Sequence, residues 1–341
     1  MDFNRALLIA EIGINHNGDM NLAKEMIKAA SKSGADAVKF QNYKTEDFII
    51  DKTLTYSYKS QGETITESQY DLFKRCELSS EDLSFLKECC DKENITFFST
   101  PTNKGGIIDL KKLGAEWLKN GSDFLGNLPL IREMAKSKIP TILSTGMATQ
   151  EEIDEAVDAF RRAGGQDLVL LACTSTYPAP LSSLNLKRIN TLSERYACKA
   201  GFSDHSSGWE AAVASVCLGA CMVEKHFTIN QNLPGPDQWF SSTPAEFAEL
   251  VRRVREVELI MGNGKLQHSD TENVARVEFK LSCVANTKMN VGDIISEHDV
   301  IFRRPGNGMP PSRIGELIGS SLIAPIEQGE CFNLSHIKKH S

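Results

Sequence analysis

Two histidines, His205 and His226, each follow a short apolar run and have a carboxylate close by, Asp204 and Glu224. A βαβ unit would place both histidines at the same end of two neighbouring parallel strands, which is where barrel enzymes keep their active sites. Imidazole and carboxylate groups together are suitable ligands for a divalent metal ion. The alternative is two unrelated polar residues at strand ends, and this stretch alone leaves both interpretations open.

Two lysines, Lys39 and Lys119, stand at the ends of other expected strands. The serines at further strand ends are Ser122, Ser144, Ser175 and Ser203. Cations, hydroxyls and Gly-rich turns together describe a pocket for phosphate or carboxylate groups. Either lysine alone could instead extend from a strand end to solvent, but both, flanked by these serines, favour a binding function.

Carboxylates that could serve in acid–base chemistry also stand at the ends of the expected strands. Glu11 and Glu224 either pair with the two lysines or supply a general base, and the sequence supports both uses. Asp237 lies in a Pro-Gly-Pro-Asp turn, where Asp is an ordinary turn residue. In a metal site, Asp237 could also hold a substrate hydroxyl.

The elements that position these residues alternate along the chain between short apolar runs and amphipathic helical segments. We expect strands at residues 7–12, 37–41, 95–99, 116–119, 141–144, 168–173, 199–202 and 221–226. Eight strand–helix repeats of this size predict a (β/α)₈ TIM barrel. A doubly wound open sheet is the alternative, but no strand is followed by Gly-x-Gly-x-x-Gly. The long polar segment 51–75 is expected to be a lid-like loop after the second strand.

The pattern changes after residue 262, so we divide the chain into three parts. Residues 1–262 form the barrel, 263–276 a polar linker, and 277–341 a small, mostly β domain. A domain of that size buries little apolar surface. We therefore expect it to dock on another surface, for example the barrel of a partner subunit.

Composition excludes several classes of function. The chain has 341 residues and a net charge of −7 with no long basic run, which argues against nucleic acid as a partner. We find no secretory leader and no apolar segment of transmembrane length, which argues against a membrane. Nine cysteines without a Cys-x-x-Cys pair suit a reducing cytoplasm. Cys173 is interpreted as a packing residue, because no activating histidine stands beside it in the sequence.

The chain resembles the sialic acid synthases and their nonulosonic acid relatives over nearly its whole length. The matching motifs are Ala10-Glu-Ile-Gly-Ile-Asn-His-Asn-Gly18, Val38-Lys-Phe-Gln41, Phe98-Ser-Thr-Pro101, Leu143-Ser-Thr-Gly-Met147, Cys173-Thr-Ser-Thr-Tyr-Pro178, Phe202-Ser-Asp-His205, Glu224-Lys-His-Phe227 and Pro234-Gly-Pro-Asp237. The segment Arg303-Arg-Pro-Gly-Asn-Gly308 is similar to the family's antifreeze-like (SAF) domain.

The resemblance implies a transferase of the EC 2.5.1 class. It would condense phosphoenolpyruvate with an N-acylated amino-hexose, either N-acetylmannosamine or a 2,4-diacetamido-trideoxyhexose, to give a sialic-acid-type nonulosonate and phosphate. It also implies a divalent cation, Mn²⁺ first with Mg²⁺ or Co²⁺ as alternatives, held by His205 and His226 and activating the sugar aldehyde.

The resemblance also assigns roles to the other residues. Lys39, Lys119, Ser122, Ser144, Ser175 and Ser203 would bind phosphoenolpyruvate. Glu11 would act as acid or base, and Gln41, Tyr177, Glu224 and Asp237 would line the sugar end. The family forms domain-swapped homodimers, so Arg304 would reach the N-acyl group of the sugar bound in the partner subunit.

Two positions depart from the family pattern. After the fourth strand the family commonly reads Lys-Ile-Gly-Ser-Gly-Glu/Asp, whereas this chain has Lys119-Asn-Gly-Ser-Asp-Phe124. The carboxylate moves to Asp123, and Phe124 takes its place, which bears on either acid–base chemistry or the identity of the sugar. The family often carries Asn at the position of Ser175. Two other functions stay open on the residues alone, a lysine Schiff-base sugar-acid aldolase and a non-catalytic sugar-binding protein.

Overall fold

The computed structural model describes residues 5–338 of the chain, so the expected outer bounds at residues 1 and 341 lie outside it. The chain divides into two compact units, and the boundary along the sequence lies between Gly262 and Asn263. Within the described residues, no helix is both long enough and apolar enough to cross a membrane.

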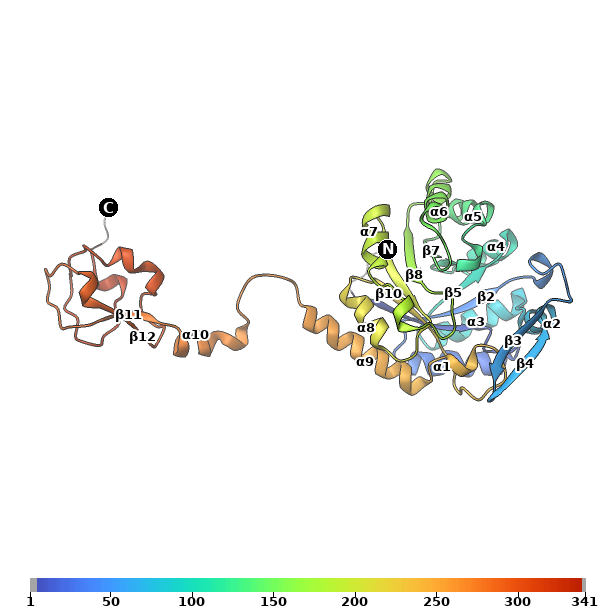
Figure 1. Ribbon diagram of the computed structural model, residues 1–341, viewed down its shortest axis with the longest axis horizontal. Helices are drawn as coiled ribbons and strands as arrows, with labels where there is room; N and C mark the ends of the chain where they lie inside the picture. Colours follow the sequence, from blue (N-terminus) through green and yellow to red (C-terminus); the bar gives the residue numbers. More distant parts are fainter. Residues whose placement is uncertain (1–4, 339–341) are drawn as a thin grey trace. The chain divides into compact units, whose positions relative to one another are not determined.

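The first unit is a closed barrel of parallel strands in the order β1-β10-β9-β8-β7-β6-β5-β2 (Figure 1). Its strands are β1 (Leu7–Gly13), β2 (Ala37–Asn42), β5 (Thr96–Pro101), β6 (Leu118–Asn120), β7 (Thr141–Ser144), β8 (Leu168–Cys173), β9 (Lys199–Asp204) and β10 (Met222–His226). The outer helices are α1 (Met20–Lys32), α3 (Ser80–Lys92), α4 (Lys104–Lys112), α5 (Leu128–Ser137), α6 (Gln150–Arg162), α7 (Arg188–Tyr196), α8 (Glu210–Cys217) and α9 (Pro244–Met261). The predicted (β/α)₈ barrel is confirmed, and the open-sheet alternative is wrong.

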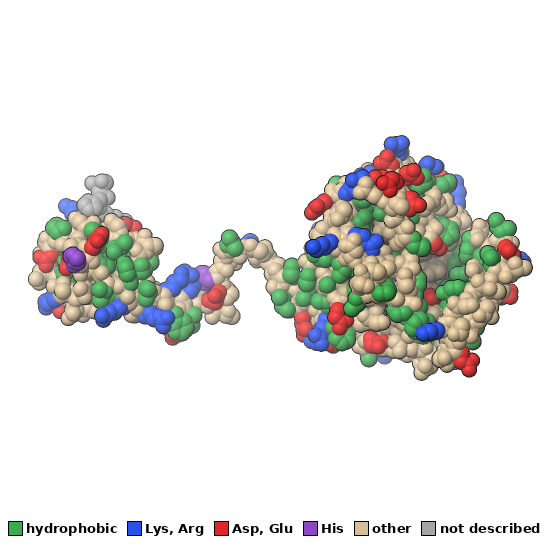
Figure 2. Space-filling model, in the orientation of Figure 1, with side chains coloured by type: hydrophobic (Ala, Val, Ile, Leu, Met, Phe, Trp, Pro, Cys, Tyr) green, Lys and Arg blue, Asp and Glu red, His purple; other side chains and the backbone are tan. Residues whose placement is uncertain are grey.

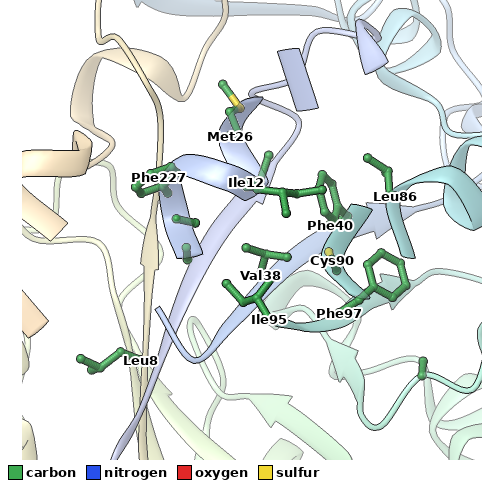
Figure 3. Close-up of a cluster of buried hydrophobic side chains, with 14 of the residues drawn as sticks. Leu8, Ile12, Met26, Val38, Phe40, Leu86, Cys90, Ile95, Phe97 and Phe227 are labelled. Carbon is green, nitrogen blue, oxygen red and sulfur yellow. The ribbon is translucent and has the colours of Figure 1, made fainter. Parts of the chain in front are cut away.

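Local sequence signals account for the helices that surround the barrel. Helix α6 begins with a reciprocal capping box between Thr149 and Glu152, which satisfies two backbone N–H groups. Its apolar residues recur on one face and are buried against the sheet. Between the sheet and the helices lies the main core, where Phe40 and Phe97 pack with Leu86 and Cys90 of α3 (Figure 3).

The inside of the barrel changes character along the strand direction. Its lower part is filled by an apolar cluster of Ile9, Ala37, Phe98, Trp117, Ile142, Val169, Leu171 and Met222. Side chains of a strand alternate between the two faces, so residues two positions further along also point inward. Those residues are Glu11, Lys39, Thr100, Lys119, Ser144, Cys173 and Glu224, all buried. The alternation therefore places polar groups directly above an apolar plug.

The segment after β2 has regular structure where we expected an unpatterned loop. It contains an antiparallel hairpin, β3 (Thr55–Ser60) and β4 (Glu63–Ser68), followed by α2 (Gln69–Cys76). Gln61 and Gly62 at the hairpin turn both have positive φ, as a two-residue turn of the I′ class requires. Its strands alternate mostly exposed polar and aromatic residues, so they carry little of the apolar signal that marks a barrel strand.

The second unit has its own small core and a two-stranded antiparallel sheet. Strands β11 (Ser282–Ala285) and β12 (Val300–Arg303) pair, and several isolated bridges hold the loops around them. The core includes Cys283, Leu317 and Phe332. Helix α10 (Asn273–Phe279) runs across the boundary that we expected at residue 276.

Candidate active site

The carboxyl ends of the barrel strands surround a cavity of about 470 Å³, a volume typical of a small-molecule site. Every site residue that we predicted in the barrel lines it: Glu11, Lys39, Gln41, Lys119, Ser122, Ser144, Ser175, Tyr177, Ser203, His205, Glu224, His226 and Asp237. In Figure 2 the barrel unit is hollowed beside the segment that follows β2. The barrel therefore gathers these residues from every strand except β5 into one place.

The floor of the cavity consists of two buried cations and two buried carboxylates. Lys39 Nζ lies 2.9 Å from Glu11 Oε2 and 3.9 Å from Glu224 Oε2. Lys119 Nζ donates a hydrogen bond to Glu224 Oε1 at 3.3 Å. Because unpaired buried charges are very costly, this balance of two positive and two negative groups is what allows them to stay in the barrel.

The two carboxylates of the floor have pKa values that are moved in opposite directions. Burial raises the pKa of Glu11 to about 7, despite the lowering effect of Lys39. Burial would also raise the pKa of Glu224, but Lys119 and Lys39 outweigh it and hold that pKa at about 2. A separation of this kind assigns different roles to two carboxyl groups. Glu11 can exchange a proton near neutral pH, and Glu224 remains a permanent counter-charge.

The two histidines lie together at the ends of β9 and β10, with ring centroids 5.3 Å apart. His205 Nδ1 lies 2.9 Å from the carbonyl oxygen of Thr174 and therefore carries the hydrogen, which leaves Nε2, 3.5 Å from Ser203 Oγ, as an acceptor. Burial, reinforced by His205, lowers the pKa of His226 well below its ordinary value. Its buried Nδ1 has no hydrogen-bond partner within residues 5–338 and lies 3.7 Å from Asp237 Oδ2.

This donor set fits a divalent cation whose coordination is completed by substrate or water. His226 presents a neutral imidazole with an unsatisfied nitrogen, and a carboxylate stands beside it, as metal ligation requires. Residues 5–338 contain no group of three or more His, Cys, Asp or Glu side chains placed to hold a metal ion. The histidine pair falls short of the four protein ligands of a closed structural site, and the divalent cation stays a prediction.

A cluster of hydroxyl groups surrounds Gly146, which follows β7. The Gly146 N–H donates to Ser122 Oγ at 3.0 Å. A Cβ added to Gly146 would lie 2.3 Å from Ser175 Oγ and 2.7 Å from Ser122 Oγ. Ser144 Oγ is buried and has no hydrogen-bond partner among the described residues. These donors, above the two lysines, form a cradle that suits the oxygens of an anion.

The remaining predicted residues of the barrel border the histidine pair and Glu11. Gln41 Nε2 donates to Glu11 Oε1 at 3.2 Å. The Tyr177 ring lies 4.3 Å from the His205 ring, centroid to centroid. Burial raises the pKa of Asp237 to about 6, against the lowering effect of His205.

Arg304 lies in the second unit, where its Nε donates to the carbonyl oxygen of Phe279 at 3.1 Å. Its guanidinium also lies 5.2 Å from the centroid of the Phe279 ring. Both of these contacts lie within the second unit.

Sequence reasoning missed several residues of the cavity. Cys173, interpreted as a packing residue, is buried but lines the cavity, and its Sγ lies 3.9 Å from His205 Nδ1. Burial would raise the pKa of this thiol, but His205 outweighs it and lowers the pKa to about 7. The sequence signal that could have identified Cys173 as a cavity residue was its position two residues after Leu171, on the same face of the strand. Sequence reasoning also missed the lining aromatic side chains Tyr43, Phe48 and Phe73, which lie beside Phe124, the residue noted above for its departure from the family pattern.

Two protein-family models match this chain, one over the barrel and one over the second unit. The NeuB family matches residues 26–266, and the SAF domain matches residues 282–338. The chain belongs to the NeuB family. The predicted resemblance to the sialic acid synthases, and the SAF character of the second unit, are thereby confirmed.

Several relatives of this NeuB family chain are named as synthases of nonulosonic acids. The N,N'-diacetyllegionaminic acid synthase of Legionella pneumophila is 39% identical, covering 97% of this chain and 94% of its own. The enzyme of the same name from Campylobacter jejuni is also 39% identical, covering 96% and 98%. The crystal structure of the N-acetylneuraminic acid synthetase of Leptospira borgpetersenii, in complex with citrate, is 36% identical with a TM-score of 0.72, covering 80% of this chain and 90% of that one.

Proposed function

We propose that this protein condenses phosphoenolpyruvate with an N-acylated amino-hexose to give a sialic-acid-type nonulosonate and inorganic phosphate. The observation that carries the proposal is the buried floor of Lys39, Glu11, Lys119 and Glu224 beneath a hydroxyl cradle and beside two histidines. Such a floor provides charge for an anionic substrate and a titratable acid next to a site for an electrophile. The named activities of the relatives support the same reaction class.

Phosphoenolpyruvate would lie over β6–β9, where the hydroxyl cradle is. Ser122, Ser175 and the Gly146 N–H would contact its phosphate, which needs several donors around one tetrahedral group. Lys39 and Lys119 supply positive charge for its phosphate and carboxylate. Ser144 and Ser203 would complete the contacts at the other oxygens.

A divalent cation, which we propose to be Mn²⁺ with Mg²⁺ or Co²⁺ as alternatives, would be held by His205 and His226. When bound, it supplies Lewis-acid polarisation of the sugar aldehyde. Asp237, beside His226, would orient a hydroxyl of the sugar, and Gln41 and Tyr177 would contact the same substrate. Burial lowers the pKa of Lys119, and Glu224, ionised throughout the neutral range, opposes this effect and holds the lysine in place.

Glu11 would carry the proton through the reaction. As C3 of phosphoenolpyruvate bonds to the aldehyde carbon, protonated Glu11 donates its proton to the aldehyde oxygen, which becomes a hydroxyl group. Glu11 then accepts a proton from the water that adds to C2. Phosphate leaves by cleavage of its C2–O bond and takes the new hydroxyl proton, so C2 becomes a carbonyl. A pKa of about 7 suits a group that must both give and take a proton.

The sugar would be either N-acetylmannosamine or a 2,4-diacetamido-trideoxyhexose, and the names of the relatives at 39% identity favour a doubly N-acylated product. We also propose that the chain works as a homodimer in which the SAF unit of one subunit covers the barrel of its partner. Arg304 would then contact the N-acyl group across the dimer.

Phosphate release from phosphoenolpyruvate tests the proposal against the aldolase alternative. Incubation with a panel of N-acyl amino-hexoses and Mn²⁺ should release phosphate with at least one sugar, and chelation should stop it. A Schiff-base aldolase would instead tolerate the chelator and be inactivated by borohydride with its substrate. If no sugar in the panel gives phosphate release with Mn²⁺ present, the proposed reaction is wrong.

A further inference from the structure

A buried ion pair lies directly behind the two histidines, on the opposite face of β9 and β10. Lys225 Nζ lies 2.7 Å from Asp204 Oδ2, and the two side chains are 6% and 0% exposed. Asp204 and Lys225 are also direct partners in the parallel register of the two strands. Each charge therefore adjoins one histidine along the chain, because His205 follows Asp204 and His226 follows Lys225.

Strand alternation explains why this pair stays out of the cavity. His205 and His226 line the cavity. Neighbouring residues of a strand point to opposite faces, so Asp204 and Lys225 point to the outer face. Helix α8, which follows β9, packs against both strands on that side. The Asp204 carboxylate, although next to His205 in the sequence, therefore does not line the cavity.

Ser206 joins the ion pair and completes a turn around His205. Its backbone N–H and its hydroxyl donate to Asp204 Oδ1 at 2.8 and 2.6 Å, the pattern of an Asx turn. Its carbonyl oxygen accepts a hydrogen bond from Lys225 Nζ at 2.7 Å. His205 lies at the centre of this turn, so the backbone is fixed on both sides of it. Lys225 ties the same turn to β10, one residue before His226.

The two faces of these strand ends differ in how far their polar groups are satisfied. On the outer face, the Asp204 carboxylate accepts three hydrogen bonds and the Lys225 ammonium donates two. On the cavity face, His226 Nδ1 and Glu224 Oε2 are buried without a hydrogen-bond partner within residues 5–338. A fully bonded network holds one arrangement, whereas open groups can receive a ligand. The ion pair thus fixes the strand ends while their cavity face stays open.

Stability alone does not account for a buried ion pair at this position. Such a pair is often no more stabilising than apolar side chains of similar volume, because desolvation offsets the attraction between the charges. It does supply a defined geometry, since its hydrogen bonds are directional. Groups behind metal-ligating side chains that fix their orientation raise the affinity for the metal ion.

We propose that Asp204 and Lys225 are positioning residues that set the separation and orientation of His205 and His226 for the divalent cation. This inference rests on the metal role that the proposed function gives to the histidines. The His205 ring is further oriented by the hydrogen bond from its Nδ1 to the carbonyl oxygen of Thr174. The turn and this bond together leave the ring few alternative positions.

The experiment measures Mn²⁺ affinity by calorimetry, without substrates, in a variant that lacks both charges. Asp204→Asn combined with Lys225→Met removes the ion pair, keeps an acceptor for Ser206 and leaves no unpaired charge. Its Mn²⁺ affinity should fall at least about tenfold, the effect of losing groups that orient metal ligands. At saturating Mn²⁺ the KM for phosphoenolpyruvate should change little, because the hydroxyl cradle around Gly146 follows other strands.

Arg255→Met is the control for a loss of stability. Arg255 lies 2.8 Å from Asp36, which precedes β2 and so lies at the end of the barrel opposite the cavity. Loss of this pair should lower the midpoint of thermal unfolding without changing the Mn²⁺ affinity. A purely structural role for Asp204 and Lys225 predicts the same result for the double variant.

Each outcome bears on the proposal. An unchanged Mn²⁺ affinity in the folded double variant would overturn it. If the double variant does not fold, Asp204→Asn alone decides in the same way, because it keeps the size of the side chain and the acceptor for Ser206. A wild type that does not bind Mn²⁺ would overturn both this proposal and the metal role. Absence of phosphate release with every N-acyl amino-hexose, together with a reduced Mn²⁺ affinity in the double variant, would overturn the proposed reaction and support the positioning role.

Discussion

Lys39 Nζ lies 2.9 Å from Glu11 Oε2, and both side chains are buried at the bottom of the cavity. The attraction of Lys39 does not fully offset the effect of burial, which still raises the pKa of Glu11 to about 7. Lys39 in turn is held charged by Glu11 and Glu224 against the effect of burial, so its pKa is raised. This relationship combines a fixed positive charge for substrate with an acid that titrates near neutral pH.

The pH dependence of catalysis should follow from Glu11. Because Glu11 donates its proton first, kcat for phosphate release should fall as the pH rises through about 7. Glu11→Gln should lower kcat at least about a hundredfold and remove this limb of the profile. A wild-type profile that stays flat from pH 6 to pH 9, under conditions where chemistry limits the rate, would contradict the role of Glu11.

Glu11 should also make the free energy of unfolding depend on pH. Its pKa is raised from 4.5 to about 7 on folding, so between these pH values the folded protein holds a proton that the unfolded chain releases. The free energy of unfolding should therefore fall with rising pH across this window, by up to about 3 kcal/mol from this group. Glu11→Gln should lack that contribution. Chemical denaturation of both proteins at several pH values measures the difference, and parallel curves would contradict it.

Gly146→Ala should weaken the binding of phosphoenolpyruvate. The new methyl group would lie 2.3 Å from Ser175 Oγ and 2.7 Å from Ser122 Oγ, so it must displace the hydroxyls of the cradle. The KM for phosphoenolpyruvate should rise at least about tenfold, whereas the sugar KM changes little. Gly126→Ala is the matched control, because a Cβ there meets nothing within 4 Å. Equal effects of the two substitutions would argue against the cradle.

Removal of the divalent cation should stop phosphate release, and added Mn²⁺ should restore it. His226→Ala should lower the affinity for Mn²⁺, measured by calorimetry without substrates, at least about tenfold. His268→Ala, at an exposed histidine of the second unit, should leave that affinity unchanged. Full activity in metal-stripped protein, or unchanged Mn²⁺ affinity in His226→Ala, would contradict the metal role.

Arg304→Ala should raise the sugar KM far more than the KM for phosphoenolpyruvate. The expected increase is at least about tenfold, the scale of losing a charged hydrogen bond to a substrate. Arg303→Ala, at the preceding residue of β12, serves as the control. If Arg304→Ala changes both KM values equally, its proposed contact with the N-acyl group is wrong. Mixing Arg304→Ala with a barrel variant such as Glu11→Gln should restore part of the activity if the contact is made across a dimer.

The sequence alone predicted the barrel and the charged and hydroxyl side chains that its strand ends bring to one cavity. Strand residues alternate with a period of two, so Ile9 in the plug implies an inward Glu11, and Ala37 implies an inward Lys39. The helix signals are similarly local, as the Thr149–Glu152 capping box shows. These patterns depend on neighbours along the chain, and for that reason they can be identified without a structure.

Only the tertiary structure decided which distant residues meet. Cys173 and His205 are 32 positions apart and come together because β8 and β9 are neighbours in the barrel. The rings of Phe48 and Phe124 meet through loops whose paths no local pattern predicts. The hairpin after β2 was missed because its strands are mostly exposed and carry little apolar pattern. The pKa values of Glu11 and Glu224 likewise depend on burial and on the placement of two lysines, which are properties of the closed barrel.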